Sequence, residues 1–318
     1  MRRVTMVGMR NDPERGRPLK QQLPYPYNQD LSRVLRGLKR RNPITRRSKQ
    51  ANDPVTAAYL AAAVRLIQRH LGPGAIRTAD DGDDPDSIQR PLLGFLSQRA
   101  VAREVDRNPP PFPRVGRPST MRERWRLQSH FIADVLRFGL WAWQYPAEHQ
   151  DEVSDAKDEV IRGPDPVRGL HRLCYWTMTS LLGTPMFRLG LIAAAEAEGD
   201  PVIGEAISGR HRENGTLWKD FYEEFLLSRG LRLRSGITLD DCDILLAAAA
   251  DGLALRALAD PAAPIADSAR RRCLLGTAAL ALIAGCAESA DDGDGMALEE
   301  AVRAMMSGPA AGSGRKPE

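Results

Sequence analysis

The dipeptide Asp-Pro opens two long stretches of this sequence in which apolar residues recur every three or four positions. Asp53-Pro54 precedes a stretch that ends at Gly72-Pro73, and Asp165-Pro166 precedes one that ends at Gly183. Aspartate accepts hydrogen bonds from the free N–H groups at the start of a helix, proline suits the first helical position, and glycine commonly follows the last turn. Both stretches are therefore predicted to be helices.

The same pattern continues along most of the chain. Leu and Ala supply most of the apolar residues, aromatic residues make up only 6% of the sequence, and alternating strand-like runs are scarce. We therefore predict an all-α protein. Further helices are expected over residues 98–105, from Ser119 or Thr120 onward, and over residues 185–200, 201–230, 238–261 and 268–288.

The charge of the chain is unevenly distributed. Residues 1–50 contain 14 Arg and Lys against 3 Asp and Glu, whereas the whole chain has a net charge of only +4, so residues 51–318 carry about −7. A basic arm on an acidic body is typical of a protein that binds a polyanion. The alternative, a disordered tail that only improves solubility, stays open.

Within this arm, residues 31–41 have the spacing of a short helix, with Leu31, Val34, Leu35 and Leu38 on one stripe. We expect the arm to lie on DNA, because the density of Pro, Gly and Arg around the short helix argues against a firmly docked element. The fold should not depend on the arm, because the segment has too little apolar surface to belong to the core. The alternative is a helix packed on the DNA-binding head with the four apolar residues buried.

The cysteines and the length of the apolar runs indicate the cellular compartment in which the protein is expected. Cys174, Cys242, Cys273 and Cys286 form no C-x-x-C pair and lie in apolar helical contexts, which indicates buried thiols in a reducing compartment. No apolar run approaches membrane-spanning length, and the first 18 residues lack the apolar core of a signal peptide. We expect a cytoplasmic protein without a membrane partner.

Motifs for enzyme chemistry are missing from the sequence. It contains no G-x-S-x-G, no P-loop and no G-x-G-x-x-G, and no His, Cys, Asp or Glu spacing typical of a metal site. We expect neither catalysis nor a metal or cofactor.

Residues 98–126 follow the order of a helix-turn-helix unit, in which two short helices are followed by a longer one. In this unit Trp125 lies among Arg122, Arg124 and Arg126. We expect Trp125 to face the core and the three arginines to point outward, because the guanidinium fork matches guanine edges and phosphates. The alternative is that the arginines form an ordinary solvated face.

Residues 119–128 resemble the recognition helix of the TetR family of bacterial one-component repressors. The family's frame, small–Thr–Leu–Tyr–x–x–Phe–x–x–Lys, is met here by Ser119, Thr120, Met121 and Trp125. The stretch GLRLRSGITLDDCDILLAAAADGLALRALADP is similar to the dimerising helices of many actinobacterial members. Together the resemblance covers roughly residues 53–288.

The chain departs from the family's pattern in three places. The Tyr and Lys of the family, which commonly touch phosphates, are Arg122 and Gln128 here, and the tight glycine-containing turn is replaced by the Pro-rich residues 107–118. Arg122 can take over the phosphate contact, and Gln128 can do so only in part.

The resemblance implies a homodimeric, ligand-responsive repressor. A small-molecule effector would bind the body and change the spacing of the two heads, which would lower the affinity for DNA. The partners would be double-stranded DNA, a second copy of the chain and this effector. The implied segments are a basic and partly disordered arm (1–52), a helix-turn-helix DNA-binding domain (53–137), a helical-bundle domain for ligand binding and dimerisation (138–290), and a flexible tail (291–318).

Three sets of site residues follow from this interpretation. DNA contacts are expected from Arg99, Arg103, Arg117, Ser119, Thr120, Arg122, Arg124, Arg126 and Gln128. An effector pocket is expected among Trp141, His171, Tyr175, Trp176, Met178, Met186, Phe187, Trp218, Phe221 and Tyr222, although each of these also suits a plain core position. The dimer interface is expected at Leu246, Ala249, Leu253, Leu274 and Leu282.

Two other functions remain open at this point. The chain could be a helical interaction or adaptor protein without DNA binding, whose arginines are only solvated. It could also be an all-α enzyme whose active site has no recognisable motif.

Overall fold

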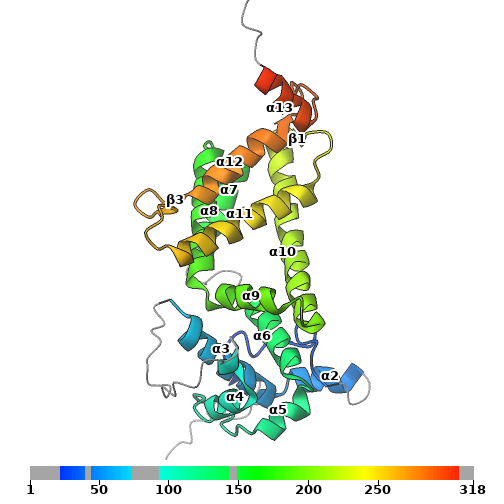
Figure 1. The fold of residues 1–318 in the computed structure, drawn as a ribbon, viewed down its shortest axis with the longest axis vertical. Coiled ribbons are helices and arrows are strands. Elements are labelled where there is room, and N and C mark those ends of the chain that lie inside the picture. Colours follow the sequence, from blue (N-terminus) through cyan, green and yellow to red (C-terminus); the bar gives the residue numbers. More distant parts are fainter. Residues whose placement is uncertain (1–21, 40–43, 74–92, 143–148, 308–318) are drawn as a thin grey trace, which may run out of the picture. The chain divides into compact units, whose positions relative to one another are not determined.

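A computed structural model of the chain describes residues 22–39, 44–73, 93–142 and 149–307. The predicted helical character is confirmed, because most of these residues are helical and the strands are few and short (Figure 1). The chain divides into two compact units. Unit 1 consists of Met1–Trp143 and Arg188–Ile207, and unit 2 consists of Gln144–Phe187 and Ser208–Glu318.

Unit 1 is built on a small group of packed helices. In this group α3 contacts both α4 and α6, and α4 contacts α5. The helices are α2 (Ile44–Ala51), α3 (Pro54–Leu71), the short 3-10 helix η1 (Gly94–Leu96), α4 (Gln98–Val105), α5 (Pro118–Arg124) and α6 (Gln128–Ala142), together with residues 188–196 of α9 (Pro185–Glu196) and 201–207 of α10 (Pro201–Ser228).

The predicted helix starts are confirmed for α3 and α4. The Asp53 carboxylate accepts a hydrogen bond from the backbone N–H of Val55 at 2.8 Å, and Pro54 occupies the first turn of α3. The Ser97 hydroxyl oxygen accepts from the N–H of Ala100 at 3.3 Å at the start of α4. These side chains satisfy N–H groups that have no partner within the helix.

The predicted start of α5 is wrong. The helix begins at Pro118, so Ser119 and Thr120 lie inside its first turn, and the N-cap residue Arg117 makes no side-chain cap. Proline at the first position explains the shift, because its fixed φ suits a helix and the N–H that it lacks would have no partner within the helix at this position. The helix ends after seven residues, since Trp125 has an extended backbone.

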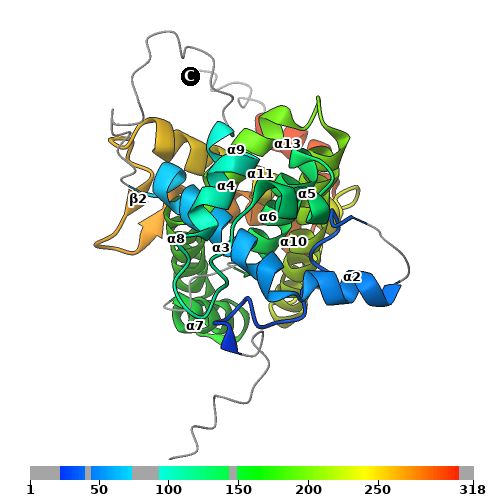
Figure 2. The same ribbon diagram turned by 90° about the horizontal axis from the view of Figure 1, so that it is seen from below.

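The N-terminal strap, residues 22–39, is packed into unit 1. The helix expected over residues 31–41 is not formed in residues 31–39, which the structure describes, because residues 32–34 make a turn and Leu38 forms a β-bridge with Trp125. Figure 2 draws this segment as an irregular dark blue trace. The strap nevertheless buries Leu23, Tyr27, Leu31, Leu35 and Leu38. The expectation that this segment has too little apolar surface to join the core is therefore wrong.

The strap can be buried without a helix because side chains from elsewhere bind its backbone. The Asp134 carboxylate accepts hydrogen bonds from the N–H groups of Arg36 and Gly37, both at 2.8 Å. The side-chain oxygen of Asn52 accepts from the N–H of Leu31 at 3.0 Å. Buried N–H groups need such hydrogen-bond partners, and the spacing of residues in the sequence does not predict which side chains these partners are.

Unit 2 is centred on α8, which packs against α7, α11 and α12. Gly169 lets α7 and α8 approach closely, since a Cβ atom there would lie 2.9 Å from the backbone nitrogen of Val160. The core between α7, α8 and α10 includes Ala156, Leu173 and Phe221. The helices are α7 (Gln150–Arg162), α8 (Pro166–Gly183), residues 208–228 of α10, α11 (Leu239–Ala259), α12 (Leu274–Cys286) and α13 (Leu298–Ser307).

Local signals in the sequence set the start of α11 but not the start of α12. Thr238 caps α11 in a capping box with Asp241, as one of the two predicted starts. By contrast, α12 begins at Leu274 and not at Ser268, because the preceding residues form a small antiparallel pair, β2 (Ala266–Asp267) with β3 (Arg272–Cys273).

A second strand pair was also not predicted. In it β1 (Leu231–Leu233) runs antiparallel to β4 (Ala287–Ser289), and Arg232 lies opposite Glu288. The guanidinium Nε of Arg232 donates to the Glu288 carboxylate at 2.9 Å. Three-residue strands are too short to show a periodic pattern, and only their pairing in the folded chain defines them.

Candidate nucleic-acid interface

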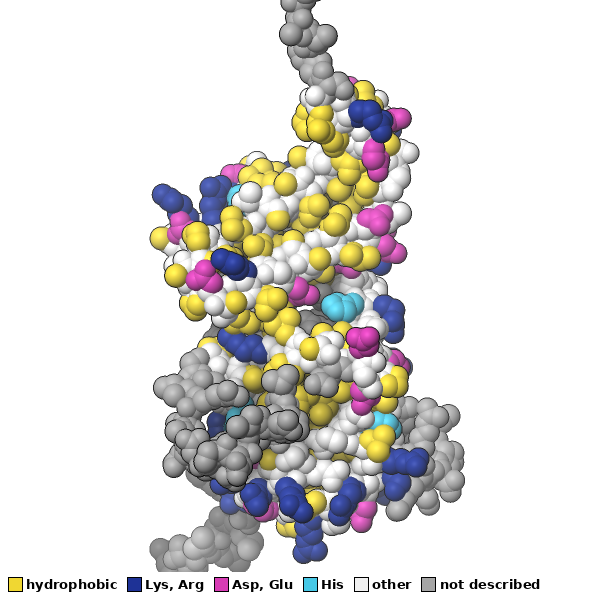
Figure 3. Space-filling model, in the orientation of Figure 1, with side chains coloured by type: hydrophobic (Ala, Val, Ile, Leu, Met, Phe, Trp, Pro, Cys, Tyr) yellow, Lys and Arg dark blue, Asp and Glu magenta, His cyan; other side chains and the backbone are white. Residues whose placement is uncertain are grey.

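The segment from α4 to the start of α6 exposes an arginine-rich surface. In residues 93–128, all of which the structure describes, seven arginines are exposed, whereas the exposed acidic residues are only Asp106 and Glu123. Figure 3 shows Lys and Arg side chains gathered at this end of unit 1. The seven, which we call the arginine surface, are Arg99, Arg103, Arg107, Arg114, Arg117, Arg122 and Arg126.

Helix α4 contributes two of these arginines because it is strongly amphipathic. Its apolar residues Val101, Ala102 and Val105 are buried, while Arg99 and Arg103 are exposed. Residues four apart lie on one face of a helix, so the two guanidinium groups project from the same side.

Helix α5 confirms one part of the expectation for the Trp125 region and corrects another. Trp125 is buried with 1% of its surface exposed, and Arg122 and Arg126 are exposed. Arg124 was expected to point outward, and this is wrong: its guanidinium donates to the Thr56 hydroxyl at 3.1 Å and to the Asp53 carboxylate at 3.2 Å. The start of α3, with its N-cap residue Asp53, lies close enough to accept these hydrogen bonds.

The Trp125 indole is satisfied inside unit 1. Its Nε1 donates to the Asp134 carboxylate at 3.0 Å, and its ring packs edge-on against Phe131 with centroids 4.9 Å apart. Burial raises the pKa of Asp134, while the hydrogen bonds that this carboxyl accepts act in the opposite direction. A large ring among arginines is thus an anchor for a short basic helix.

The Pro-rich connection between α4 and α5, residues 106–117, is held firmly in place. Asn108 is fully buried, and its amide nitrogen donates to the carbonyls of Ala58 and Pro113 at 3.2 and 3.0 Å. Gly116 passes so close to α4 that a Cβ atom there would lie 2.0 Å from the Ala102 carbonyl oxygen. This connection is therefore fixed against α3 and α4 by specific contacts.

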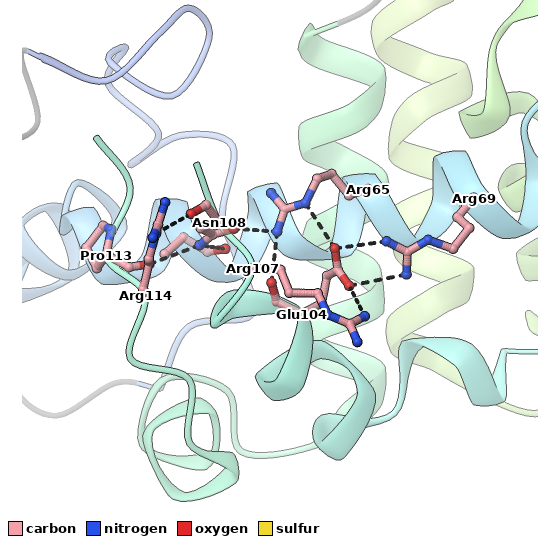
Figure 4. A network of polar contacts seen from close by, with 8 residues as sticks. Arg65, Arg69, Glu104, Arg107, Asn108, Pro113 and Arg114 are labelled. Carbon is pink, nitrogen blue, oxygen red and sulfur yellow. Dashed lines mark hydrogen bonds and ion pairs between the residues drawn. The ribbon is translucent and has the colours of Figure 1, made fainter. Parts of the chain in front are cut away.

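A buried carboxylate links this connection to α3 (Figure 4). Glu104 accepts hydrogen bonds from Arg65 at 3.1 Å, from Arg69 at 3.1 and 3.2 Å, and from Arg107 at 3.3 Å. Arg65 also donates to the side-chain oxygen of Asn108 at 2.5 Å. Burial alone raises the pKa of Glu104, but the hydrogen bonds and positive charges of Arg69 and Arg65 outweigh it and hold this pKa below its ordinary value.

The remaining predicted DNA contacts differ in accessibility. Arg117 and Ser119 are exposed and Thr120 is half-buried. The amide nitrogen of Gln128 donates to the Leu96 carbonyl, so this group is already bonded within unit 1. Tyr59 holds the start of α5, because its hydroxyl donates to the Arg117 carbonyl at 2.7 Å and accepts from the Arg117 N–H at 2.9 Å.

Two exposed arginines of this surface, Arg107 and Arg114, were missed by the sequence reasoning. They lie in the Pro-rich connection, which we treated only as a departure from the family's pattern. The positive charge density of that stretch was the signal that could have found them. Its closeness to α4 and α5 became visible only in the folded chain.

The predicted pocket residues are divided between the units. Trp141 belongs to unit 1 and is exposed, and the other nine belong to unit 2. Of these, Phe221 belongs to the core cluster of α7, α8 and α10, and Trp176, Trp218 and Tyr222 pack against this cluster. Met178, Met186 and Phe187 are buried, and Lys157 lies over the ring of Trp218 at 4.8 Å. Most of these residues thus have core positions.

Four buried polar atoms of unit 2 lack a hydrogen-bond partner in the described part of the chain. They are His149 Nδ1, His171 Nδ1, Trp176 Nε1 and Ser180 Oγ. The His149 and Trp176 rings lie 4.6 Å apart, and the Arg271 guanidinium lies over Trp176 at 5.6 Å. Burial lowers the pKa of His171, with a further contribution from the positive charge of Arg272.

Helices α11 and α12 leave much apolar surface uncovered (Figure 3). Of the predicted interface residues, Leu274 is exposed, and Leu246, Ala249, Leu253 and Leu282 are half-buried. The structure adds three exposed apolar residues of α11, namely Ile244, Leu245 and Leu255.

The described residues contain no group of three or more His, Cys, Asp or Glu that could hold a metal ion. None of their helices is by itself long and apolar enough to cross a membrane, and only the consecutive helices α8 and α9 together reach the required length and composition. A comparison of the chain with family models, curated proteins and solved structures found no match.

Proposed function

We propose that the chain is a DNA-binding transcriptional regulator that acts as a homodimer and responds to a small-molecule effector. The observation that carries this proposal is the arginine surface: seven exposed arginines on α4, the connection, α5 and the bend that follows α5, with two exposed acidic residues among them. Arginine binds phosphates and guanine edges through a planar fork, and such a surface supplies the electrostatic part of DNA binding.

The anchoring of this surface supports a specific interface over a loosely solvated one. Helix α5 is held at its start by Tyr59 and at its end by Arg124, and the connection is held by Asn108. Side chains fixed on a rigid scaffold lose little entropy on binding, which favours sequence-selective recognition. In this proposal Arg122 and Arg126 contact DNA and Arg124 does not.

Dimerisation through α11 and α12 is proposed from their uncovered apolar surface. Ile244, Leu255 and Leu274 are 65%, 52% and 45% exposed. A monomeric protein in water rarely exposes neighbouring large apolar residues on this scale, and a second copy would cover them. The effector is proposed from unit 2, where the unpartnered Trp176 Nε1 and Ser180 Oγ could bind polar groups of a ligand.

The test of the proposal is binding to duplex DNA at several salt concentrations. Arg122→Ala with Arg126→Ala should flatten the dependence of log K on log salt by about 0.9 for each phosphate that is no longer neutralised. The matched control is Arg212→Ala with Arg270→Ala, which removes two exposed arginines of unit 2 and should leave the slope unchanged. Binding that both double variants weaken equally would contradict an interface on the arginine surface.

The alternative is a helical interaction protein, and the uncovered face of α11 is the observation that favours it. In that case the wild-type chain would bind duplex DNA no more tightly than its charge alone predicts. It would show no preference between a duplex selected from a random pool and the same bases in scrambled order.

A further inference from the structure

The carboxylate of Asp134 binds both the strap, 97 residues away in the sequence, and Trp125, nine residues away. Its Oδ1 accepts from the N–H groups of Arg36 and Gly37 at 2.8 Å, its Oδ2 accepts from the Trp125 indole at 3.0 Å, and Arg137 donates to Oδ1 at 3.2 Å. Asp134 is fully buried on α6. A single buried acceptor therefore holds the strap and the residue that ends α5.

The strap also contacts the end of α5 directly. Leu38 forms a β-bridge with Trp125, and the Lys39 N–H donates to the Arg124 carbonyl at 2.7 Å. These contacts are made to backbone groups that α5 itself cannot satisfy, because the last carbonyls of a helix have no partner within it.

Gly37 makes the fit of the strap on α6 unusually close. A Cβ atom at this position would lie 2.5 Å from the backbone carbonyl oxygen of His130. Only glycine therefore allows the strap to reach Asp134 along this path.

Helix α5 depends on such contacts because it is short. A helix of seven residues is not stable alone in water, since helices below about 12 residues are marginal even in favourable sequences. Its start is bound to Tyr59 of α3, and its end is bound to the strap and, through Trp125, to Asp134. Loosening the second attachment leaves the end of α5 held by the Arg124 side chain without the strap and the carboxylate, so Arg122 on the helix and Arg126 just after it lose part of their fixed orientation.

We propose that Asp134 is a positioning residue for DNA recognition: by docking the strap and Trp125 on one carboxylate, it fixes α5 in the orientation that sequence selectivity requires. The proposal rests on the DNA-binding function proposed above. Asp134 itself touches no DNA, and it acts through the strap and α5. General attraction to phosphates does not depend on it, because the arginines remain on the surface.

The first experiment measures hydrogen exchange of the full-length protein without DNA. In Asp134→Asn, the side-chain amide replaces one of the two acceptor oxygens by donor N–H groups, which face either the strap or the indole, and it removes the negative charge that both attachments share. Amide exchange in residues 31–39 and 118–126 should accelerate together by about tenfold or more, as expected when hydrogen bonds to a charged group are removed, with α3 unchanged. Faster exchange in the strap alone would overturn the proposal, and so would equal acceleration throughout unit 1.

A second variant perturbs the strap from its other side. Gly37→Ala leaves Asp134 and Trp125 intact but drives a methyl group against the His130 carbonyl, so α5 should again exchange faster. The matched control is Arg33→Ala, which removes an exposed side chain of the same strap and should change nothing. Unchanged exchange of α5 in Gly37→Ala would show that the strap does not hold this helix.

The second experiment measures selectivity with two duplexes, one that the wild-type protein selects from a random pool and one with the same bases scrambled. Asp134→Asn and Gly37→Ala should lower the ratio of the two affinities by about tenfold or more, with the salt dependence on the scrambled duplex unchanged. Preserved discrimination with a loosened α5 would overturn the positioning role. If the wild-type protein selects no sequence, the proposed function fails, whereas the exchange experiment still decides whether Asp134 and the strap fix α5.

Discussion

The α3–α6 end of unit 1 and helix α11 of unit 2 differ in which side chains they bury and which they expose. At the first, Trp125 is buried, Glu104 and Asp134 are bound on several sides, and arginines face outward. Helix α11, all 21 residues of which the structure describes, buries only Ala254. The first region is complete within one chain and offers charge to a partner. The second offers apolar surface, which only another apolar surface can cover.

The largest effect is expected from emptying the core of the complete region. Trp125→Ala should lower the free energy of unfolding by about 3–5 kcal/mol, because it removes a buried ring and leaves the Asp134 carboxylate without one donor. Chemical denaturation checks this. The matched control Leu127→Ala, two residues away and 51% exposed, should cost no more than about 0.5 kcal/mol. Equal effects of the two variants would mean that Trp125 is not an anchor.

A somewhat smaller effect is expected at the buried carboxylate of the same region. Glu104→Gln should cost about 2–3 kcal/mol, less than for a fully buried pair because Arg69 and Arg107 are largely exposed. Denaturation of Glu104→Gln and of the exposed control Glu123→Gln at neutral pH tests this, and only the first should lose stability.

The same residue predicts the direction of a pH effect. The pKa of Glu104 is lower in the folded chain than its ordinary value of 4.5, so its contribution is complete above that value and is lost as the pH falls through the folded pKa. The wild-type protein should therefore lose more stability than Glu104→Gln between neutral and strongly acidic pH. Parallel losses, followed by denaturation at a series of pH values, would show that this carboxylate does not couple to folding.

Substitutions on the exposed face of α11 should change the affinity of dimerisation and not the stability of the fold. Leu253→Glu on α11 should weaken dimerisation by about 10- to 100-fold, because burial of a leucine contributes about 1.5–3 kcal/mol. Sedimentation at several concentrations measures it. The control is Val167→Glu, an exposed apolar position on α8 that should leave the dimer intact. A wild-type chain that is monomeric at micromolar concentration would contradict the proposal that a second copy covers the apolar surface of α11.

The smallest effect is expected at the outer face of the complete region. Arg122→Ala should leave the melting temperature unchanged, because its side chain is exposed, and should flatten the salt dependence of DNA binding by about 0.9 if it contacts one phosphate. Arg124→Ala should do the reverse, since its guanidinium is bonded to Thr56 and Asp53. Thermal melting and fluorescence anisotropy on both variants distinguish the two arginines.

The sequence by itself determined the helical fold, the bounds of α4, the cap of α3 and the inward position of Trp125, and it narrowed the cap of α11 to two residues. These features depend on neighbours within one or two turns, and the spacing of apolar and capping residues records them directly. The same reasoning marked Arg122 and Arg126 as outward-facing.

Only the tertiary structure decided the burial of the strap, the inward turn of Arg124 and the late start of α12. The first two depend on partners remote in sequence: Asp134 lies 97 residues from Gly37, and Thr56 lies 68 residues from Arg124. The start of α12 depends on a nearer strand pair, in which Ala266 lies opposite Cys273. Residues 31–39 carry the spacing of a helix, yet side chains from α6 and from the end of α2 bind their N–H groups and replace helical hydrogen bonds. The spacing of apolar residues cannot distinguish a helix from the observed strap, because either arrangement satisfies the backbone and buries the same leucines.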